Sequence, residues 1–303
     1  MTIMIGLVRC GGFEYRTRRW VDIRSERGGV TEFGMIVEHG SRRFDLAAST
    51  YDRRTRIPPT KCEEIARAVV SLSRAARGDA LLELGAGTGQ IGIFFPETGV
   101  RYTGLDVSAP MLAVFKERCG NHSDRYGLVH ADVNQSWPVS DASVRCIFSS
   151  RAVHLFDKEN VLREAGRVAL ETGAALVLGR VERDPDSVRQ QLKLEKRARL
   201  ADRGFLAVDG EGRQRNVLAQ ARAQGAEPFA AKVAATWQVR HRAGDVLSDW
   251  SETPGLGGSS LPAGVKKELL ADLRRFAQSR FGSLDTFHES EDRYVLEGVW
   301  FRR

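Results

Sequence analysis

The chain has 303 residues and a mass of 33.6 kDa; 42% of its residues are hydrophobic and 28% are charged. A chain of this size and composition can bury a large core, which excludes a wholly disordered protein. No run approaches the roughly 18 apolar residues of a membrane span, and Met1 to Cys10 lacks the apolar stretch of a secretory signal. We therefore expect a soluble, cytoplasmic protein.

The net charge is +7, and the basic residues are 38 arginines and 8 lysines. An anionic partner such as nucleic acid would account for this excess, but the arginines are scattered, which favours a simple compositional bias. The four cysteines form no CxxC pair, so neither a zinc site nor a disulfide framework is predicted, and no histidine shows metal-ligand spacing. We expect reduced thiols, no metal and no membrane partner.

The first 45 residues are the least informative part of the chain. Alternating stretches at Phe13 to Ile23 and Val30 to Val37 are compatible with a β-hairpin around Gly28-Gly29. A loosely attached extension is equally compatible. A start at Met35 is a third interpretation, which would leave residues 1–34 outside the native product.

From residue 61 onward, short apolar runs alternate with amphipathic segments. Strands are predicted at 80–84, 100–105, 127–130, 144–149 and 174–181, and helices at 61–73, 90–97, 109–119 and 158–168. Alternation of this kind indicates βαβ units and a parallel sheet covered on both faces. The predicted fold class is α/β, with a doubly wound, mostly parallel sheet.

The remaining segments complete a four-part division of the chain. Residues 184–224 are charged and helical and predict an inserted helical cap, while residues 266–281 and 294–301 predict a tail helix and a final strand. We divide the chain into an uncertain N-terminal extension (1–43), a core (44–182), the cap (183–228) and a C-terminal part of the sheet with the tail helix (229–303).

A glycine-rich turn lies between the first strand and the next predicted helix. Gly85, Gly87 and Gly89 allow a tight turn and close approach of a ligand to the backbone, at the edge where doubly wound sheets bind nucleotide-like molecules. The helix that follows would offer free N–H groups to a carboxylate or phosphate. The dinucleotide fingerprint needs its third glycine where Gln90 stands, which argues against NAD.

Asp106 stands at the end of the second predicted strand, 17 residues after Gly89. A carboxylate at that place can accept both hydroxyls of an adenosine ribose. The alternative is that it merely caps the helix that begins near Ser108. The glycine loop and this aspartate together favour adenosine binding.

These segments resemble class I S-adenosylmethionine-dependent methyltransferases. Glu83-Leu-Gly-Ala-Gly-Thr-Gly-Gln90 is similar to the first motif of that family, and Gly104-Leu-Asp-Val-Ser-Ala-Pro-Met-Leu112 to the second. His130-Ala-Asp-Val133 resembles the segment after the third strand, and Phe148 to Phe156 the segment after the fourth. The resemblance extends from about Phe44 to Glu182 and implies a seven-stranded Rossmann-like sheet with S-adenosylmethionine as cofactor.

The resemblance also implies roles for individual residues. Asp132 would bind the adenine amino group, with Ala131 and Val133 beside the ring, and Tyr51 and Arg56 would belong to an N-terminal helix that closes over the cofactor. The full set expected to bind the cofactor is Tyr51, Arg56, Glu83, Gly85, Ala86, Gly87, Thr88, Gly89, Asp106, Val107, Met111, Ala131, Asp132, Val133 and Ser149.

Recognition of the acceptor is expected further along the chain. His154 is the candidate general base and also a candidate acceptor contact, because it follows the fourth strand; a packed histidine is the alternative. Trp237, Arg240 and Trp250 are candidate acceptor contacts, although tryptophans are more often part of a core. The C-terminal part faintly resembles methyltransferases of small carboxylic acids such as trans-aconitate methyltransferase.

The sequence thus predicts a methyltransferase that acts on an oxygen, nitrogen or carbon of a small molecule, including a carboxylate or a secondary metabolite. An RNA methyltransferase is the alternative within enzymes. It is disfavoured because Ser149-Ser150-Arg151-Ala152 replaces the Asn/Asp-Pro-Pro-aromatic motif of base-amine methyltransferases. A non-catalytic cofactor-binding scaffold is the alternative outside enzymes, and an NAD-dependent oxidoreductase is a more distant one.

Overall fold

The computed structural model describes residues 7–10, 13–16, 57–205, 210–252 and 261–301. The chain divides into two units, residues 1–37 and 38–303. In the first unit, β1 (Leu7–Cys10) pairs with β2 (Phe13–Arg16) in antiparallel register. The predicted hairpin around Gly28-Gly29 lies largely outside the described residues, and Phe13–Arg16, expected to belong to it, pairs with Leu7–Cys10 instead.

In the described part of the second unit, seven strands form one sheet in the order β5-β4-β3-β6-β7-β9-β8. Five are parallel: β3 (Ala80–Leu84), β4 (Arg101–Asp106), β5 (Tyr126–His130), β6 (Cys146–Ser150) and β7 (Ala174–Arg183). The other two, β8 (Glu227–Arg242) and β9 (Phe287–Phe301), pair antiparallel to each other, and β9 pairs antiparallel to β7. The predicted doubly wound, mostly parallel sheet is confirmed.

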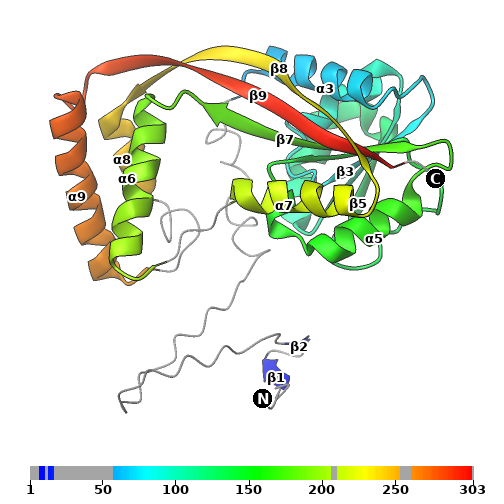
Figure 1. The fold of residues 1–303 in the computed structure, drawn as a ribbon, viewed down its shortest axis with the longest axis horizontal. Helices are drawn as coiled ribbons and strands as arrows, with labels where there is room; N and C mark the ends of the chain where they lie inside the picture. The colour runs from blue at the N-terminus through cyan, green and yellow to red at the C-terminus, as the bar shows by residue number, and fades with distance from the viewer. Residues whose placement is uncertain (1–6, 11–12, 17–56, 206–209, 253–260, 302–303) are drawn as a thin grey trace. The chain divides into compact units, whose positions relative to one another are not determined.

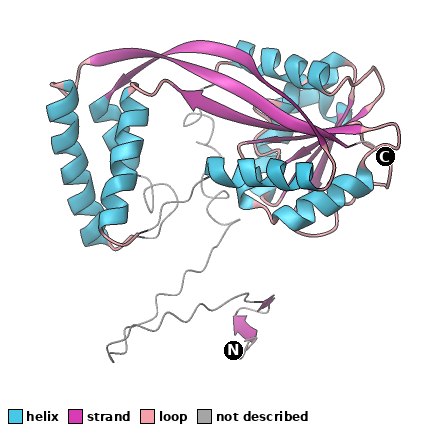
Figure 2. Ribbon diagram, viewed as in Figure 1, coloured by secondary structure: helices cyan, strands magenta, loops and turns pink. Residues whose placement is uncertain are grey.

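Alternate residues of the central strands face opposite sides of the sheet, and each side has its own buried cluster. Helices cover both sides (Figures 1 and 2). On one side, α3 (Pro59–Leu72) and α4 (Ala109–Cys119) pack on Leu81, Phe148 and Val177. On the other, α5 (Lys158–Val168) and α7 (Gly210–Ala223) pack on strand residues such as Ile147 and Leu176.

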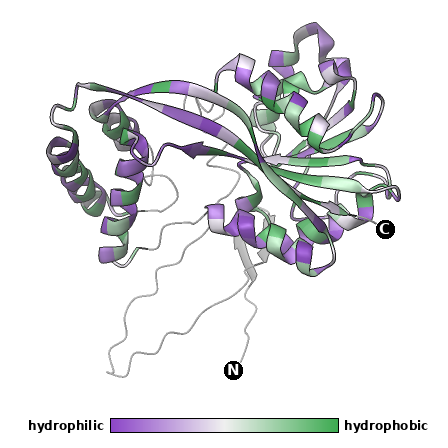
Figure 3. Cartoon of the chain, turned by 45° about the horizontal axis from the view of Figure 1, so that its top comes forward, coloured by the Kyte–Doolittle hydropathy of each residue, from purple (hydrophilic) through white to green (hydrophobic). Residues whose placement is uncertain are grey.

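The strands β7, β9 and β8 continue beyond the parallel part of the sheet as a long ribbon (Figure 1). At its far end α6 (Val188–Asp202), α8 (Ala243–Glu252) and α9 (Ala263–Phe281) pack together around a third cluster that includes Leu192, Val246 and Leu273. We call these three helices the helical module. Figure 3 shows the central strands as mainly apolar, whereas much of the ribbon and module is polar.

Two sequence-based predictions differ from the structure. The predicted helix at 90–97 is two 3₁₀ turns, η2 (Gly92–Phe94) and η3 (Pro96–Thr98), because Pro96 lacks the N–H that a continuous helix needs there. The predicted cap also has two parts: α6 belongs to the helical module, while α7 packs on the sheet and on η5 (Val153–Leu155). A last 3₁₀ segment is η4 (Gly120–Arg125).

Candidate cofactor and acceptor site

The glycine-rich loop follows β3 at the point where the strand order reverses. β3 pairs with β4 on one side and with β6 on the other, so the chain leaves β3 and β6 in opposite directions. In open α/β sheets, ligands bind in the crevice beyond the carboxyl ends of strands at such a switch point. The loop after Leu84 and the segment after Ser150 meet at this edge.

Gly87 and Gly89 serve different purposes in the loop. Both have positive φ angles, +56° and +74°. A Cβ on Gly89 would lie 2.2 Å from the ring of Phe115, so this glycine allows α4 to pack against the loop, whereas a Cβ on Gly87 would meet no atom within 4 Å. The backbone at Gly87 is therefore the part of the loop that a ligand can approach.

The carboxylate of Asp106 links the glycine loop to the start of α4. Its Oδ2 accepts a hydrogen bond of 2.8 Å from the Gly87 N–H, and its Oδ1 accepts one of 2.8 Å from the Ser108 N–H. The Ser108 hydroxyl accepts from the Met111 N–H and caps α4, so Asp106 is not the cap of that helix. A carboxylate oxygen can accept more than one hydrogen bond, so a group of this kind is chemically suited to bind ribose hydroxyls.

The residues expected around an adenine ring lie next to Asp106. The Ala131 N–H donates to the Asp106 carbonyl oxygen over 3.0 Å, which places the segment after β5 beside the end of β4. Val107 is 41% exposed although it is apolar, Ala131 is half-buried and Asp132 is exposed, while Val133 and Met111 are buried. An exposed valine next to Asp106 is a suitable surface for a flat ring.

Glu83 is buried beneath the loop at the end of β3. The Tyr102 hydroxyl donates a hydrogen bond of 2.6 Å to its Oε2. Burial raises the pKa of Glu83 to about 8, against the smaller opposing effect of the Tyr102 hydrogen bond. Nearby, the buried Ser149 hydroxyl donates to the Leu84 carbonyl oxygen over 2.9 Å and joins β6 to the start of the loop.

Four residues outside the predicted set of site residues also make contacts at this edge. Gln90 accepts a hydrogen bond of 2.9 Å from the guanidinium group of Arg151, whose φ of +57° is uncommon for a residue other than glycine. The hydroxyls of Ser150 and Tyr294 are 2.6 Å apart. In the sequence, Gln90 was notable only because it replaces the third glycine of the dinucleotide fingerprint. Nothing in the sequence pointed to Tyr294 except its place in an alternating strand.

The residues expected at the acceptor site lie on different elements. His154 lies half-buried in η5, and its carbonyl oxygen accepts from Arg213 of α7 over 2.9 Å. Trp237 is buried in β8, Arg240 lies over the Phe287 ring and pairs with Glu289, and Trp250 lies in the helical module against Lys196. Tyr51 and Arg56 lie outside the described residues.

The free helix N-terminus expected after the glycine loop is absent from the described segment 85–98. The loop closes on itself through the Gly89 N–H, which donates to Ala86, and the three-residue η2 follows. Binding of an anion there by an α-helix N-terminus was therefore a wrong prediction. The loop backbone and the Asp106 carboxylate are the groups available at this edge.

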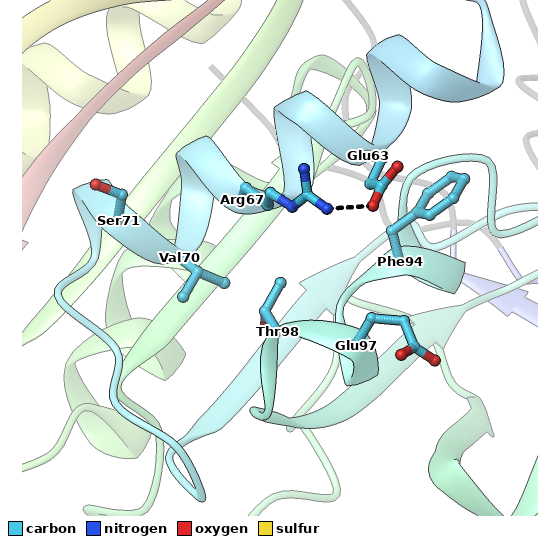
Figure 4. A pocket seen from close by; sticks show the side chains of 7 residues that line it. All are labelled: Glu63, Arg67, Val70, Ser71, Phe94, Glu97 and Thr98. Carbon is cyan, nitrogen blue, oxygen red and sulfur yellow. Dashed lines mark hydrogen bonds and ion pairs between the residues drawn. The ribbon is translucent and has the colours of Figure 1, made fainter.

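A shallow pocket of about 260 Å³ lies between α3 and the turns η2 and η3 (Figure 4). Glu63 and Arg67 form an ion pair along its wall, and Val70, Phe94 and Thr98 supply apolar surface. None of the residues predicted to bind cofactor or acceptor lines it, so it is separate from the site at the strand ends.

Residues 81–173 match the model of a family described as a methyltransferase domain. The chain is similar to malonyl-[acyl-carrier protein] O-methyltransferases of Pectobacterium atrosepticum, at 32% identity over 38% of this chain and 42% of the relative, and of Serratia marcescens, at 30% identity over 44% and 49%. The matches thus span less than half of each relative's length.

Among solved structures, the fold is similar to that of the BH2331 protein of Bacillus halodurans, with a TM-score of 0.52 at 16% identity over 78% of this chain and 99% of that one. It is also similar to that of the YcgJ protein of Bacillus subtilis, with a TM-score of 0.51 at 16% identity over 79% and 98%. None of the helices in the described part of the chain is both long and apolar enough to cross a membrane. Residues 81–173 therefore form a methyltransferase domain, set in a Rossmann-like methyltransferase fold that the later strands complete.

Proposed function

We propose that the chain binds S-adenosylmethionine at the carboxyl ends of β3, β4 and β5 and transfers its methyl group to a small molecule. The observation that carries this proposal is the Asp106 carboxylate, which holds the open backbone at Gly87 at the edge where the strands end. The exposed Val107 and Asp132 beside it suit the adenine ring and its amino group.

Bound S-adenosylmethionine would supply a methyl carbon on a positively charged sulfur, which forms a bond to the acceptor while the carbon–sulfur electron pair goes to the sulfur. The task of the protein is then to align the acceptor and exclude water, for which good positioning contributes on the order of 7–11 kcal/mol. Ser149 and Ser150 end β6 and Arg151 follows them, beside the glycine loop; in this proposal they face the reacting end of the cofactor.

The similarity to O-methyltransferases supports an oxygen of the acceptor as the methylated atom. A carboxylate is already ionised and needs a positioning cation, whereas a hydroxyl needs a base. His154, in η5 after β6, is the residue that we propose to accept that proton. Within the larger set expected from the sequence, Tyr51 and Arg56 are proposed as further cofactor contacts, and Arg240 and Trp250 as acceptor contacts.

Transfer of labelled methyl from S-adenosylmethionine to a panel of small carboxylates and alcohols tests the proposal. We expect transfer by the full chain and at least about a hundredfold loss in Gly87→Arg, whose side chain would fill the ligand's place. Exposed Lys116→Met is the matched control and should keep full activity. Transfer by Gly87→Arg at the wild-type rate would contradict the proposal.

Two further expectations from the sequence stay proposals. A cytoplasmic location is proposed on the composition of the chain. A nucleic-acid acceptor remains the alternative, and transfer to RNA that falls steeply between about 50 and 200 mM salt would favour it over a small molecule.

A further inference from the structure

Three polar residues form a row across the ribbon. Asp292 of β9 is the register partner of Arg183 at the end of β7 and also of Trp237 in β8. Directly paired residues of antiparallel strands point to the same face, with Cβ atoms about 5 Å apart. Arg183, Asp292 and Trp237 are therefore neighbours on one face of three adjacent strands.

Each residue of this row has a buried polar atom without a hydrogen-bond partner among the described residues. These atoms are Arg183 Nε, Asp292 Oδ1 and Trp237 Nε1. Asp292 is 6% exposed and Trp237 is 7% exposed, and Arg183 Nε lies 3.8 Å from Asp292 Oδ2, beyond hydrogen-bond distance. Buried polar groups are nearly always hydrogen-bonded in folded proteins, so three in one row indicate a binding partner.

The surroundings of the row carry an excess of positive charge. Burial lowers the pKa of Arg183, and the neighbouring Arg151 adds to this effect while Asp292 and Glu211 oppose it. Burial also lowers the pKa of Lys193 on α6, which lies 3.4 Å from Glu211. The charged groups facing the row and Lys193 are the cations Arg151, Arg189 and Arg197 and the acids Asp184 and Glu211.

The row adjoins the site at the strand ends. Arg151 contacts Gln90 of the glycine loop and also interacts electrostatically with Arg183, Tyr294 and Glu83. Tyr294 stands two residues after Asp292 on β9 and so faces the same side. A molecule bound against the row therefore lies on the side of the site where the acceptor is needed.

We propose that Arg183 and Trp237 bind an anionic group of the acceptor, a carboxylate or a phosphate, through Arg183 Nε–H and Trp237 Nε1–H, with Asp292 orienting the guanidinium. This inference rests on the proposed function and names the acceptor class. Lys193 adds positive charge from α6, so that the sheet and the helical module both contribute to acceptor recognition. Two buried N–H donors without acceptors are costly, and the cations Arg151, Arg189, Arg197 and Lys193 around the row favour an acceptor group with negative charge over a neutral one.

Calorimetric titration of the full chain tests this, with and without S-adenosylhomocysteine, using malonate, inorganic phosphate and the neutral malonamide as probes. We expect an anion to bind, with affinity reduced at least about tenfold in Arg183→Gln and a few-fold in Trp237→Phe, which keeps the ring and removes only the N–H. Arg183→Lys should recover part of the affinity. The exposed cation variants Arg77→Gln and Lys116→Met should bind as wild type.

Preferred binding of malonate assigns a carboxylate and preferred binding of phosphate assigns a phosphate; both support the inference. Equal affinity in wild type and Arg183→Gln, equal binding of malonamide, or no binding of either anion would overturn it. Unfolding midpoints and S-adenosylhomocysteine affinity, expected to be unchanged in these variants, show that each variant is folded. Anion binding to a chain that does not bind S-adenosylhomocysteine would contradict the proposed function and leave the anion site standing.

Discussion

At the scale of single residues, two glycines of the loop have different roles: Gly89 is required for packing, and Gly87 is open to a ligand. The ring of Phe115 fills the space where a Cβ of Gly89 would stand, whereas the space at Gly87 is open. The two positions have similar backbone conformations, so their substitution by alanine is a matched comparison.

We predict that Gly89→Ala destabilises the fold by roughly 2 kcal/mol or more, because the added methyl overlaps Phe115 at a strained φ. Gly87→Ala should cost only about 1–2 kcal/mol, the cost of the left-handed conformation alone, but should weaken S-adenosylhomocysteine binding. Urea unfolding and calorimetry measure the two effects. Equal destabilisation by both substitutions would contradict this division.

Glu83 gives a prediction on pH. Its pKa is raised to about 8 in the folded chain from an ordinary value of 4.5, so the folded state binds the proton more tightly. The stability that this group contributes is complete below pH 4.5 and is lost as the pH rises towards 8. Glu83→Gln cannot ionise and keeps an acceptor for the Tyr102 hydroxyl, so its unfolding free energy should fall less over this range.

Urea unfolding between about pH 5 and 8.5 measures this difference. The control is Glu171→Gln, an exposed glutamate, which should follow the wild-type profile. A Glu83→Gln variant whose stability depends on pH as steeply as wild type would show that Glu83 does not titrate in that range.

At the scale of elements, buried strands and capped helices could be predicted from the sequence, and exposed or interrupted elements could not. Residues 80–84, 109–119 and 158–168 have the predicted bounds, because unbroken apolar runs and clear start signals define them. The glycine loop and Asp106 of the site could be predicted because their positions at the ends of two successive strands are visible in the spacing of residues along the chain.

The strand β8 was not identified as a separate element for a physical reason. Most of its residues are exposed, and register shifts between Phe229 and Lys232 and between Val233 and Ala235 break the alternation on which strand prediction depends. The row of Arg183, Asp292 and Trp237 could not be predicted for a different reason: it exists only through the pairing of three strands that are distant in sequence.

The helical module has its own core and its own group of ion pairs around Asp272. Asp272 of α9 accepts hydrogen bonds from Arg203 and Arg275 and lies 3.6 Å from Arg199. These arginines lower its pKa, so its contribution is present above pH 3.8 and is lost as the pH falls through the lowered value.

Asp272→Asn should therefore speed backbone hydrogen exchange in α6 and α9 at least about tenfold at neutral pH, while exchange in β3, β4 and β6 stays unchanged. Asp245→Asn, which alters an exposed pair with Arg242 in the same module, is the control. Equal acceleration in the module and the central strands would show that the module does not open on its own.

At the scale of the whole molecule, the described part of the chain has three separate buried clusters, two of which support the edge of the sheet that carries the site. The first two hold the ends of β3, β4 and β6, where the methyltransferase domain presents its loop and Asp106. The third closes the far end of the ribbon, and the pair of Lys193 and Glu211 joins α6 of the helical module to α7.

The central claim is that the edge at Gly87 and Asp106 binds the adenosyl group of the cofactor, and calorimetric titration with S-adenosylhomocysteine tests it most directly. The account predicts binding by the full chain, weakened about 10- to 100-fold in Asp106→Asn through loss of hydrogen bonds to a charged group, and unchanged in the exposed control Asp124→Asn. Absence of binding by the full chain, or equal affinity in wild type and Asp106→Asn, would contradict it.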